Sequence, residues 1–105
     1  MYVKLSGIEV LEIGPGTNRR YPFRPKASWG CEVVFLDLEK PSDDVKNFGH
    51  WVLGDAQTLP FRESVFAQIV ASHVIEHLED PLKFLSECRR ILKTGGSLDI
   101  YSKLH

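Results

Sequence analysis

Four positions suited to binding a ligand each follow a short apolar run of this 105-residue chain: Gly14, Asp37, Asp55 and Ser72. A glycine allows a tight turn and lets a ligand lie against backbone amides. A carboxylate at a strand end can accept hydrogen bonds from a ribose diol. If the apolar runs are strands of one parallel sheet, the four positions meet at its carboxyl edge, where such sheets bind ligands. This convergence is the strongest functional signal in the sequence.

A glycine turn, Glu12-x-Gly14-x-Gly16, ends the first of these runs. A Gly-x-Gly by itself is weak evidence, since many strand ends need such a turn. Glu12 strengthens it, because a carboxylate inside a buried strand needs a partner. Asp37 adds a second acid at the end of the next run. The alternative is that both acids only solvate the ends of their strands.

The elements that must position these residues are predicted by apolar runs bounded by turn residues. The expected strands are 8–13, 32–38, 51–53, 65–71 and 97–101. A short helical piece is expected near 41–48, because N-cap residues open that stretch. Buried strands that alternate with crossovers indicate a parallel sheet covered on both faces, and therefore an α/β fold. The length favours a single domain over residues 1–105.

The best helix of the chain is expected to begin at Asp80-Pro81, because Asp is a favoured N-cap and Pro suits the first helical position. The expected apolar stripe consists of Leu82, Leu85, Cys88 and Leu92, with Phe84 and Ile91 alongside. Gly95-Gly96 is expected to end the helix in a left-handed stop, after Lys93 in its last turn.

The sequence His73-Val74-Ile75-Glu76-His77 matches H-x-x-E-H, the zinc signature of inverted metalloproteases. On a helix, the two histidines would share one face and could bind zinc, with Glu76 as the base. The motif directly follows an expected strand, however, so His73 should lie on the turn. A further acidic ligand would also have to come from a short remaining chain. We therefore expect no metal site, a site role for His73 and a structural role for His77.

Composition excludes several classes of protein. Hydrophobic residues (43%) and charged residues (26%) are typical of a globular domain rather than a disordered chain. The formal net charge of -1 provides no basic field for nucleic acid, and no apolar stretch approaches the roughly 20 residues of a membrane span. Cys31 and Cys88 are too few for a disulfide framework, so we expect a reduced, cytoplasmic protein.

Basic and aromatic residues are interleaved between residues 19 and 26. They are Arg19, Arg20, Arg24 and Lys26, around Tyr21 and Phe23. Such a segment can bind phosphates and stack bases, or it can be a solvated loop whose aromatic rings fold onto the sheet. We favour the loop, because the net charge gives no support to a nucleic-acid partner.

Several segments resemble those of class I S-adenosylmethionine-dependent methyltransferases: VLEIGPGT at 10–17, VVFLDLE at 33–39 and GDAQTLPF at 54–61. Residues 66–102 are similar to the fourth strand, the following helix and the fifth strand of the small-molecule branch. The resemblance implies a Rossmann-like, doubly wound, mainly parallel sheet with strand order 3-2-1-4-5. The family's sheet normally has seven strands, so this chain looks like a short form truncated to about five.

The resemblance also implies S-adenosylmethionine as cofactor and methyl transfer to a small-molecule or unknown acceptor. Asp37 falls on the family's ribose-binding acid, and Asp55 and the Ala56 amide fall on its adenine-binding positions. The expected cofactor-binding residues are Glu12, Gly14, Gly16, Asp37, Leu38, Asp55, Ala56 and Ser72. His73 is the candidate catalytic base, required only if the acceptor must lose a proton.

Two other functions stay open. The chain can be a non-catalytic S-adenosylmethionine-binding or interaction module within an assembly. A dinucleotide-dependent oxidoreductase is disfavoured, because position 19 is Arg rather than the glycine that completes Gly-x-Gly-x-x-Gly. We also expect a homodimer, formed through the edge of the strand at 97–101 or through exposed helix faces such as Phe84.

Overall fold

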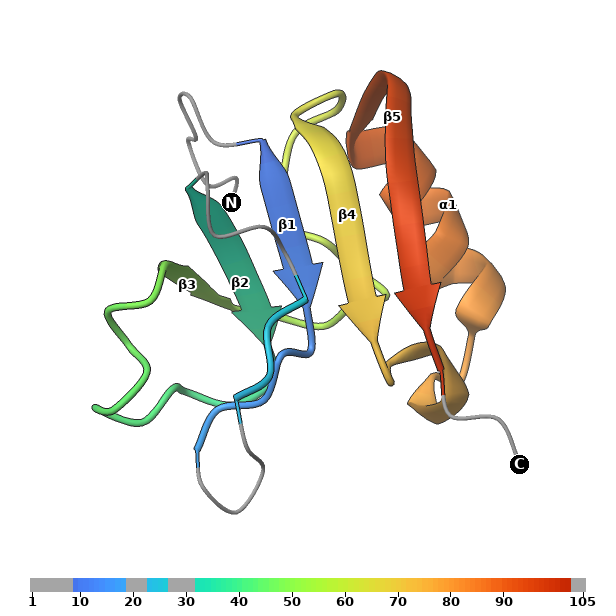
Figure 1. Cartoon of the computed structure of the whole chain (residues 1–105). Helices are drawn as coiled ribbons and strands as arrows, with labels where there is room; N and C mark the ends of the chain where they lie inside the picture. Colours follow the sequence, from blue (N-terminus) through green and yellow to red (C-terminus); the bar gives the residue numbers. More distant parts are fainter. Residues whose placement is uncertain (1–8, 19–22, 27–31, 103–105) are drawn as a thin grey trace.

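The computed structural model describes residues 9–18, 23–26 and 32–102. Within these residues, five strands form one parallel sheet in the order β3-β2-β1-β4-β5 (Figure 1). The strands are β1 Val10–Ile13, β2 Val33–Asp37, β3 His50–Leu53, β4 Phe66–Ser72 and β5 Leu92–Tyr101. The short 3-10 helix η1 (Ile75–His77) and the helix α1 (Pro81–Ile91) connect β4 to β5. The predicted fold class and strand order are confirmed.

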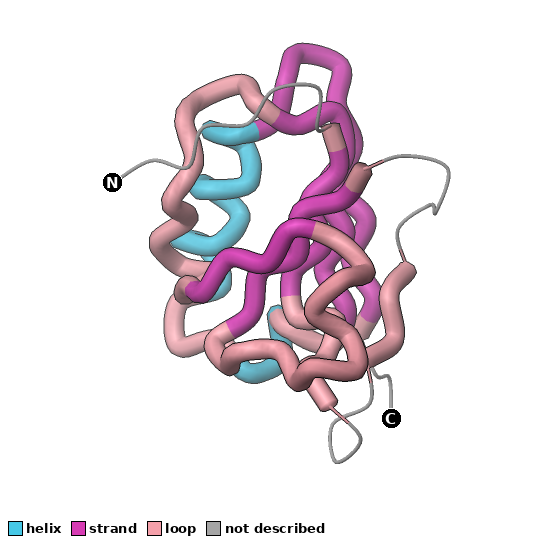
Figure 2. The backbone as a smooth tube through the Cα atoms, turned by 90° about the vertical axis from the view of Figure 1, so that its left-hand side faces the viewer, coloured by secondary structure: helices cyan, strands magenta, loops and turns pink. Residues whose placement is uncertain are grey.

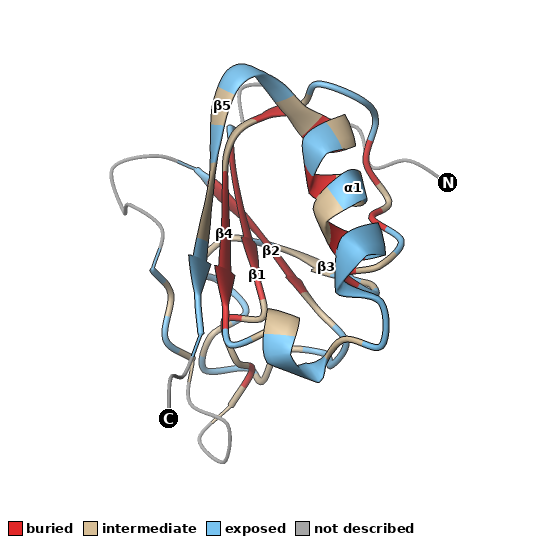
Figure 3. Ribbon diagram, turned by 90° about the vertical axis from the view of Figure 1, so that its right-hand side faces the viewer, coloured by how far each residue is buried: buried red, intermediate tan, exposed pale blue. Residues whose placement is uncertain are grey.

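The sheet has two differently covered faces. The helix α1 packs on one of them, as the tube in Figure 2 and the edge-on view in Figure 3 show. The main core lies on this side and includes Leu11, Val34, Leu36, Ile69, Phe84, Cys88 and Ile91. On the opposite face, within the described residues, Phe23 and Trp51 pack against Phe35, with ring centroids 5.1 Å and 4.9 Å from it. The ring of Phe23 thus folds onto the sheet, as the loop interpretation of 19–26 requires; residues 19–22 lie outside the described residues.

The helix α1 begins as its sequence predicts. Asp80 Oδ1 accepts a hydrogen bond from the Lys83 amide at 3.0 Å, and Pro81 occupies the first turn. Most of the predicted apolar stripe is confirmed: Phe84, Cys88 and Ile91 are buried, and Leu85 and Leu92 pack against the core. The exception is Leu82, which is 76% exposed. Because Phe84 is fully buried, it cannot form an exposed face for a dimer.

The end of α1 differs from the prediction. The helix ends at Ile91, and β5 begins directly at Leu92 rather than at 97. Gly95 has a φ of 82° inside β5, and the pairing with β4 shifts register between Phe66 and Gln68. A Cβ on Gly96 would lie 2.9 Å from the Ala67 carbonyl oxygen. The two glycines therefore serve an irregularity of the strand, not a helix stop.

The segment 41–48 is also not the predicted helical piece. It forms a run of turns, in which the Val45 and Lys46 amides both donate to the Ser42 carbonyl at 3.2 Å and 3.1 Å. Phe48 is half exposed but still lies beside Phe23, with ring centroids 5.5 Å apart. A segment this short forms a marginal helix unless tertiary packing stabilises it.

Burial makes a testable prediction for Cys88. Desolvation, with a smaller effect of Glu87, raises the pKa of this fully buried thiol to about 12. Because the thiolate is the reactive form, maleimide should not label Cys88 in the native protein at pH 7.5 and should label it readily in denaturant. Peptide mapping by mass spectrometry separates Cys88 from Cys31, which lies outside the described residues. Rapid native labelling of Cys88 would contradict its position in the core.

Candidate functional site

A cavity of about 340 Å³ opens at the carboxyl edge of the sheet. Six of the nine predicted site residues line it: Gly14, Asp37, Leu38, Asp55, Ala56 and His73. The other described residues of its wall are Ile13, Leu36, Gly54, Val74, His77 and Leu78. Its volume lies in the range of small-molecule sites, roughly 300–1,000 Å³.

The strand order explains why the cavity lies there. The chain leaves β1 towards β2 on one side, whereas β4 pairs with the other edge of β1. Connections that diverge in this way leave a crevice at the carboxyl ends of the strands. The ends of β1, β2 and β3 thus meet at this cavity, as the sequence predicts. From β4, the residue that lines the cavity is His73, which follows the strand.

A larger hollow lies elsewhere. It measures about 440 Å³ and is lined mainly by residues of α1 and β5, among them Leu85, Arg89 and Leu98. It contains none of the predicted site residues. Polar strand ends converge only on the smaller cavity among the described parts of the chain, and we therefore assign the site there.

The glycine turn after β1 needs glycine for two physical reasons. Gly14 and Gly16 have φ values of 71° and 92°, which side chains disfavour. A Cβ on Gly14 would lie 2.5 Å from Val74 Cγ2, so the close approach of the segment after β4 requires a bare backbone. The Gly14 amide also donates to the Leu36 carbonyl at 2.9 Å, which extends the ladder between β1 and β2 into the turn.

Three further hydrogen bonds hold the turn in place. The Pro15 carbonyl accepts from the Arg24 amide at 2.7 Å, and the Thr17 carbonyl accepts from the Ser42 amide at 2.8 Å. The Thr17 hydroxyl donates to Glu39 Oε2 at 3.3 Å. The glycine turn is therefore fixed to the segment after β2, next to Asp37.

The two acids of the cavity lie at the ends of neighbouring strands. Asp37 Oδ1 accepts from the Glu39 amide at 3.3 Å, and Asp55 Oδ1 accepts from the Gln57 amide at 2.8 Å. Among the described residues, Oδ2 of each acid makes no hydrogen bond. Each side chain is thus oriented by one oxygen and retains the other as an acceptor for a ligand.

The apolar part of the wall comes from both ends of the cavity. Leu38 is 74% exposed at the rim, and Ala56 is buried next to Asp55. Val74 and Leu78 contribute from the segment that contains η1. These last two residues were not predicted, although their position directly after the end of β4 could have indicated them. An apolar wall beside two acceptors suits a flat heterocycle with polar edges.

His73 lies on the turn after β4, as expected, with a left-handed φ of 55°. Its amide donates to the Tyr101 carbonyl at 2.6 Å, and its Nδ1 lies 3.5 Å from Glu76 Oε1. The imidazole is half exposed on the wall of the cavity, and His77 lines the same wall. The imidazole of His73 is therefore accessible from the cavity, with the Glu76 carboxylate beside it.

The H-x-x-E-H motif does not form a metal-binding helix. His73 precedes η1 and His77 ends it, so the two histidines are not one α-helical turn apart on a common face. No cluster of three or more potential metal ligands occurs in the residues that the structure describes.

Glu12, Gly16 and Ser72 are not among the described residues of the cavity wall, although they lie in or next to the strands that form it. Glu12 is fully buried on β1, and its Oε1 accepts from the Lys26 amide at 2.7 Å. A backbone amide of the loop on the second face thus supplies one partner for this buried carboxylate. Ser72 is also buried, and its hydroxyl has no hydrogen-bond partner among the described residues.

Sequence comparison relates most of the chain to one protein family. A family described as "Methyltransferase domain" matches residues 11–100. The bifunctional biotin biosynthesis protein BioHC of Cellvibrio japonicus is 34% identical over 98 residues, which is 89% of this chain and 19% of that protein. The ubiquinone/menaquinone biosynthesis C-methyltransferase UbiE of a Ruegeria species is 31% identical, over 88% of this chain and 41% of that protein. The chain thus spans less than half the length of these relatives.

Comparison with solved structures relates the chain to a methyltransferase as well. The carbon methyltransferase CurJ superposes with a TM-score of 0.72 at 26% identity, over 94% of this chain and 30% of that one. The part of CurJ that corresponds to this chain thus has the same sheet and crossover arrangement.

The contact between Gly14 and Val74 makes a prediction that is independent of any ligand. Gly14→Ala should lower the free energy of unfolding by roughly 1–3 kcal/mol, because it combines an unfavourable φ with a steric clash. Urea unfolding followed by circular dichroism measures this loss.

Gly95→Ala is the matched control, because Gly95 also has a positive φ but no atom within 4 Å of an added Cβ. It should cost only about 1 kcal/mol, and adding Val74→Ala to Gly14→Ala should recover part of the difference. Equal losses at Gly14 and Gly95 would contradict the close packing of the turn.

Proposed function

Since the chain belongs to the methyltransferase domain family, we propose that it binds S-adenosylmethionine in the cavity at the carboxyl edge and transfers its methyl group to an acceptor. The observation that carries the proposal is the convergence of Gly14, Asp37 and Asp55 on one cavity of about 340 Å³. A glycine turn open to backbone approach, two oriented carboxylates and an apolar wall match the parts of a nucleoside. The cofactor would supply a methyl group already activated on a sulfonium, so the protein mainly positions the acceptor.

Different residues of the cavity would contact different parts of the cofactor. The second oxygen of Asp37 would accept from the ribose hydroxyls, and Asp55 with the Ala56 amide would contact the edge of the adenine. Leu38 would cover a face of the nucleoside. Gly14 would let the cofactor lie against the backbone of the turn.

The remaining predicted residues would act from beside the cavity. Glu12 lies on β1, directly before the glycine turn. It would support the turn through the hydrogen bond that its carboxylate accepts from the Lys26 amide. Gly16 would keep the end of the turn that follows Gly14 free of side chains. Ser72, whose hydroxyl is buried, directly precedes His73. His73 would act as general base if the acceptor must lose a proton, with its ring oriented by Glu76.

Calorimetric titration with S-adenosylhomocysteine, S-adenosylmethionine and NAD tests this function. Binding of the first two without NAD is expected. A methyl-transfer assay with small-molecule acceptors then separates an enzyme from a non-catalytic cofactor-binding module, which would bind without transfer. The proposal would be rejected if the folded protein bound neither S-adenosylmethionine nor S-adenosylhomocysteine.

Asp37 gives the sharpest single-residue prediction. Asp37→Ala should weaken the binding of S-adenosylhomocysteine by roughly 10- to 100-fold, because it removes charge-assisted hydrogen bonds worth about 1.5–3 kcal/mol. The melting temperature should change little, because the side chain makes one long hydrogen bond. The control is Asp44→Ala, an exposed acid in the turn that follows. Unchanged affinity in folded Asp37→Ala would remove this residue from the site.

We further propose that two copies of the chain form a homodimer through β5. In the part of the chain that the structure describes, β5 pairs with β4 alone, which leaves one row of backbone groups without a strand partner. Ile100 and Tyr101 at its end are 38% and 47% exposed. Light scattering at micromolar concentration should give twice the chain mass of 11.9 kDa. A mass of one chain without concentration dependence would contradict the dimer.

The expected partner is a small-molecule acceptor rather than nucleic acid, in keeping with the net charge of -1. Of the helices in the described residues, none has the length and apolar character needed to cross a membrane. A cytoplasmic location remains part of the proposal and is supported by the sparse use of cysteine, with Cys88 held as a buried thiol.

A further inference from the structure

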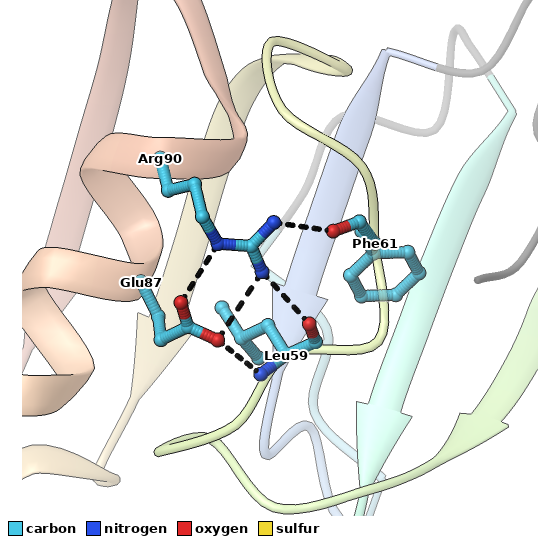
Figure 4. Close-up of polar contacts among 4 residues, drawn as sticks. All are labelled: Leu59, Phe61, Glu87 and Arg90. Carbon is cyan, nitrogen blue, oxygen red and sulfur yellow. Dashed lines mark hydrogen bonds and ion pairs between the residues drawn. The ribbon is translucent and has the colours of Figure 1, made fainter. Parts of the chain in front are cut away.

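The segment that carries Asp55 and Ala56 is held at its far end by two side chains of α1. Arg90 Nη2 donates to the Leu59 carbonyl at 2.9 Å, and Arg90 Nη1 donates to the Phe61 carbonyl at 2.7 Å. The Leu59 amide donates to Glu87 Oε1 at 2.8 Å. Both backbone polar groups of Leu59 are therefore bound by this pair of residues, as the dashed lines in Figure 4 show.

Glu87 and Arg90 are also bound to each other. Arg90 Nε donates to Glu87 Oε2 at 2.8 Å, and the side chains are only 27% and 19% exposed. The hydrogen bond from Arg90 is the main cause that holds the pKa of Glu87 below its ordinary value, with contributions from the Leu59 amide and the charges of Arg90 and Lys83, against the opposing effect of burial. Arginine suits this position because its planar guanidinium presents donors in fixed directions.

A tight turn connects Leu59 to the cavity. Asp55 Oδ1 accepts from the Gln57 amide, and the Asp55 carbonyl accepts from the Thr58 amide at 3.0 Å. Leu59 follows this turn directly and is buried, as Ala56 is. These two hydrogen bonds close the turn that joins Asp55 to Leu59.

A second contact from the start of α1 supports the same turn. The Asp80 amide donates to Gln57 Oε1 at 2.7 Å. The helix thus holds the 55–61 segment near both of its own ends, although Glu87 and Arg90 are not among the described residues that line the cavity.

We propose that Glu87 and Arg90 are positioning residues for cofactor binding: by holding both backbone groups of Leu59, they fix Asp55 and Ala56 at the wall of the cavity. This inference rests on the proposed function, because Asp55 and Ala56 are there assigned to the adenine. It adds that a pair of residues on α1, outside the cavity, determines the affinity of the site.

Arg90→Lys tests the role of the guanidinium. Lysine keeps the positive charge but cannot bind two carbonyls and a carboxylate in fixed directions. The affinity for S-adenosylhomocysteine, measured by calorimetry, should fall on the order of 10-fold, the size expected for loss of such a hydrogen bond. The matched control is Arg89→Lys, the exposed neighbour on the same helix, which should leave the affinity unchanged. Unchanged affinity in folded Arg90→Lys would overturn the inference.

Glu87→Gln provides a milder second variant in case Arg90→Lys does not fold. Glutamine retains an acceptor for the Leu59 amide but loses the charge and the second oxygen, which accepts from Arg90 Nε. Its affinity for S-adenosylhomocysteine should fall below that of the wild type, by less than the roughly 10-fold expected for Arg90→Lys. An affinity equal to that of the wild type, when Arg90→Lys is also unfolded, would count against a positioning role.

A double-mutant cycle separates positioning from a general loss of stability. If Arg90 acts through Asp55, the effect of Arg90→Lys on affinity should shrink when it is made in Asp55→Ala. A purely structural role would give additive effects, and additivity would overturn the inference.

Hydrogen exchange of the ligand-free protein keeps this inference distinct from the proposed function. Arg90→Lys should speed exchange of the amides between 56 and 59, whereas Arg89→Lys should not. If the wild type does not bind S-adenosylhomocysteine, the proposed function fails while the exchange experiment still decides whether the pair orders this segment. Unchanged exchange in folded Arg90→Lys would overturn the inference.

Discussion

The rest of the structure depends on the parallel pairing of β1, which has β2 along one edge and β4 along the other. All four residues of β1 are buried, so the strand is held by the core on both faces as well as by two ladders. Parallel pairing puts every strand end at the same edge. Because the connections diverge from β1, this edge opens between the ends of β1 and β4, and the cavity follows from the topology.

Close approach of the backbone segments then gives the cavity its shape. Gly14 allows the turn after β1 to approach Val74 on the segment after β4. On the far side of the cavity, the 55–61 segment is attached to α1 by Arg90 and Glu87. The same helix therefore covers the core with Phe84 and Cys88 and holds one wall of the site with the polar residues beside them.

Much of the fold could be predicted from the sequence because its signals are local. The cap at Asp80-Pro81 involves only neighbouring residues, and the positive φ of Gly14 is a property of one residue. The acids at the strand ends were also predictable. The apolar run of β2 stops at Asp37 in the sequence, and burial stops at the same residue. The exposure of Leu82 was less predictable: Leu82 and Phe84 are both apolar, but the face of α1 that packs on the core carries Phe84, Cys88 and Ile91 and leaves Leu82 exposed.

The sequence by itself determined which apolar runs form the strands and which polar residues follow them at one edge of the sheet. It also determined the resemblance that implies the strand order 3-2-1-4-5. Tertiary structure alone decided where α1 gives way to β5, because pairing with β4 favours an extended Leu92 over another turn of helix. It also decided the two backbone carbonyls that Arg90 binds, which lie 29 and 31 residues away along the chain. A capping residue or a turn glycine acts on atoms within a few bonds, whereas the partners of a side chain on α1 are set by how the whole sheet brings distant backbone beside it.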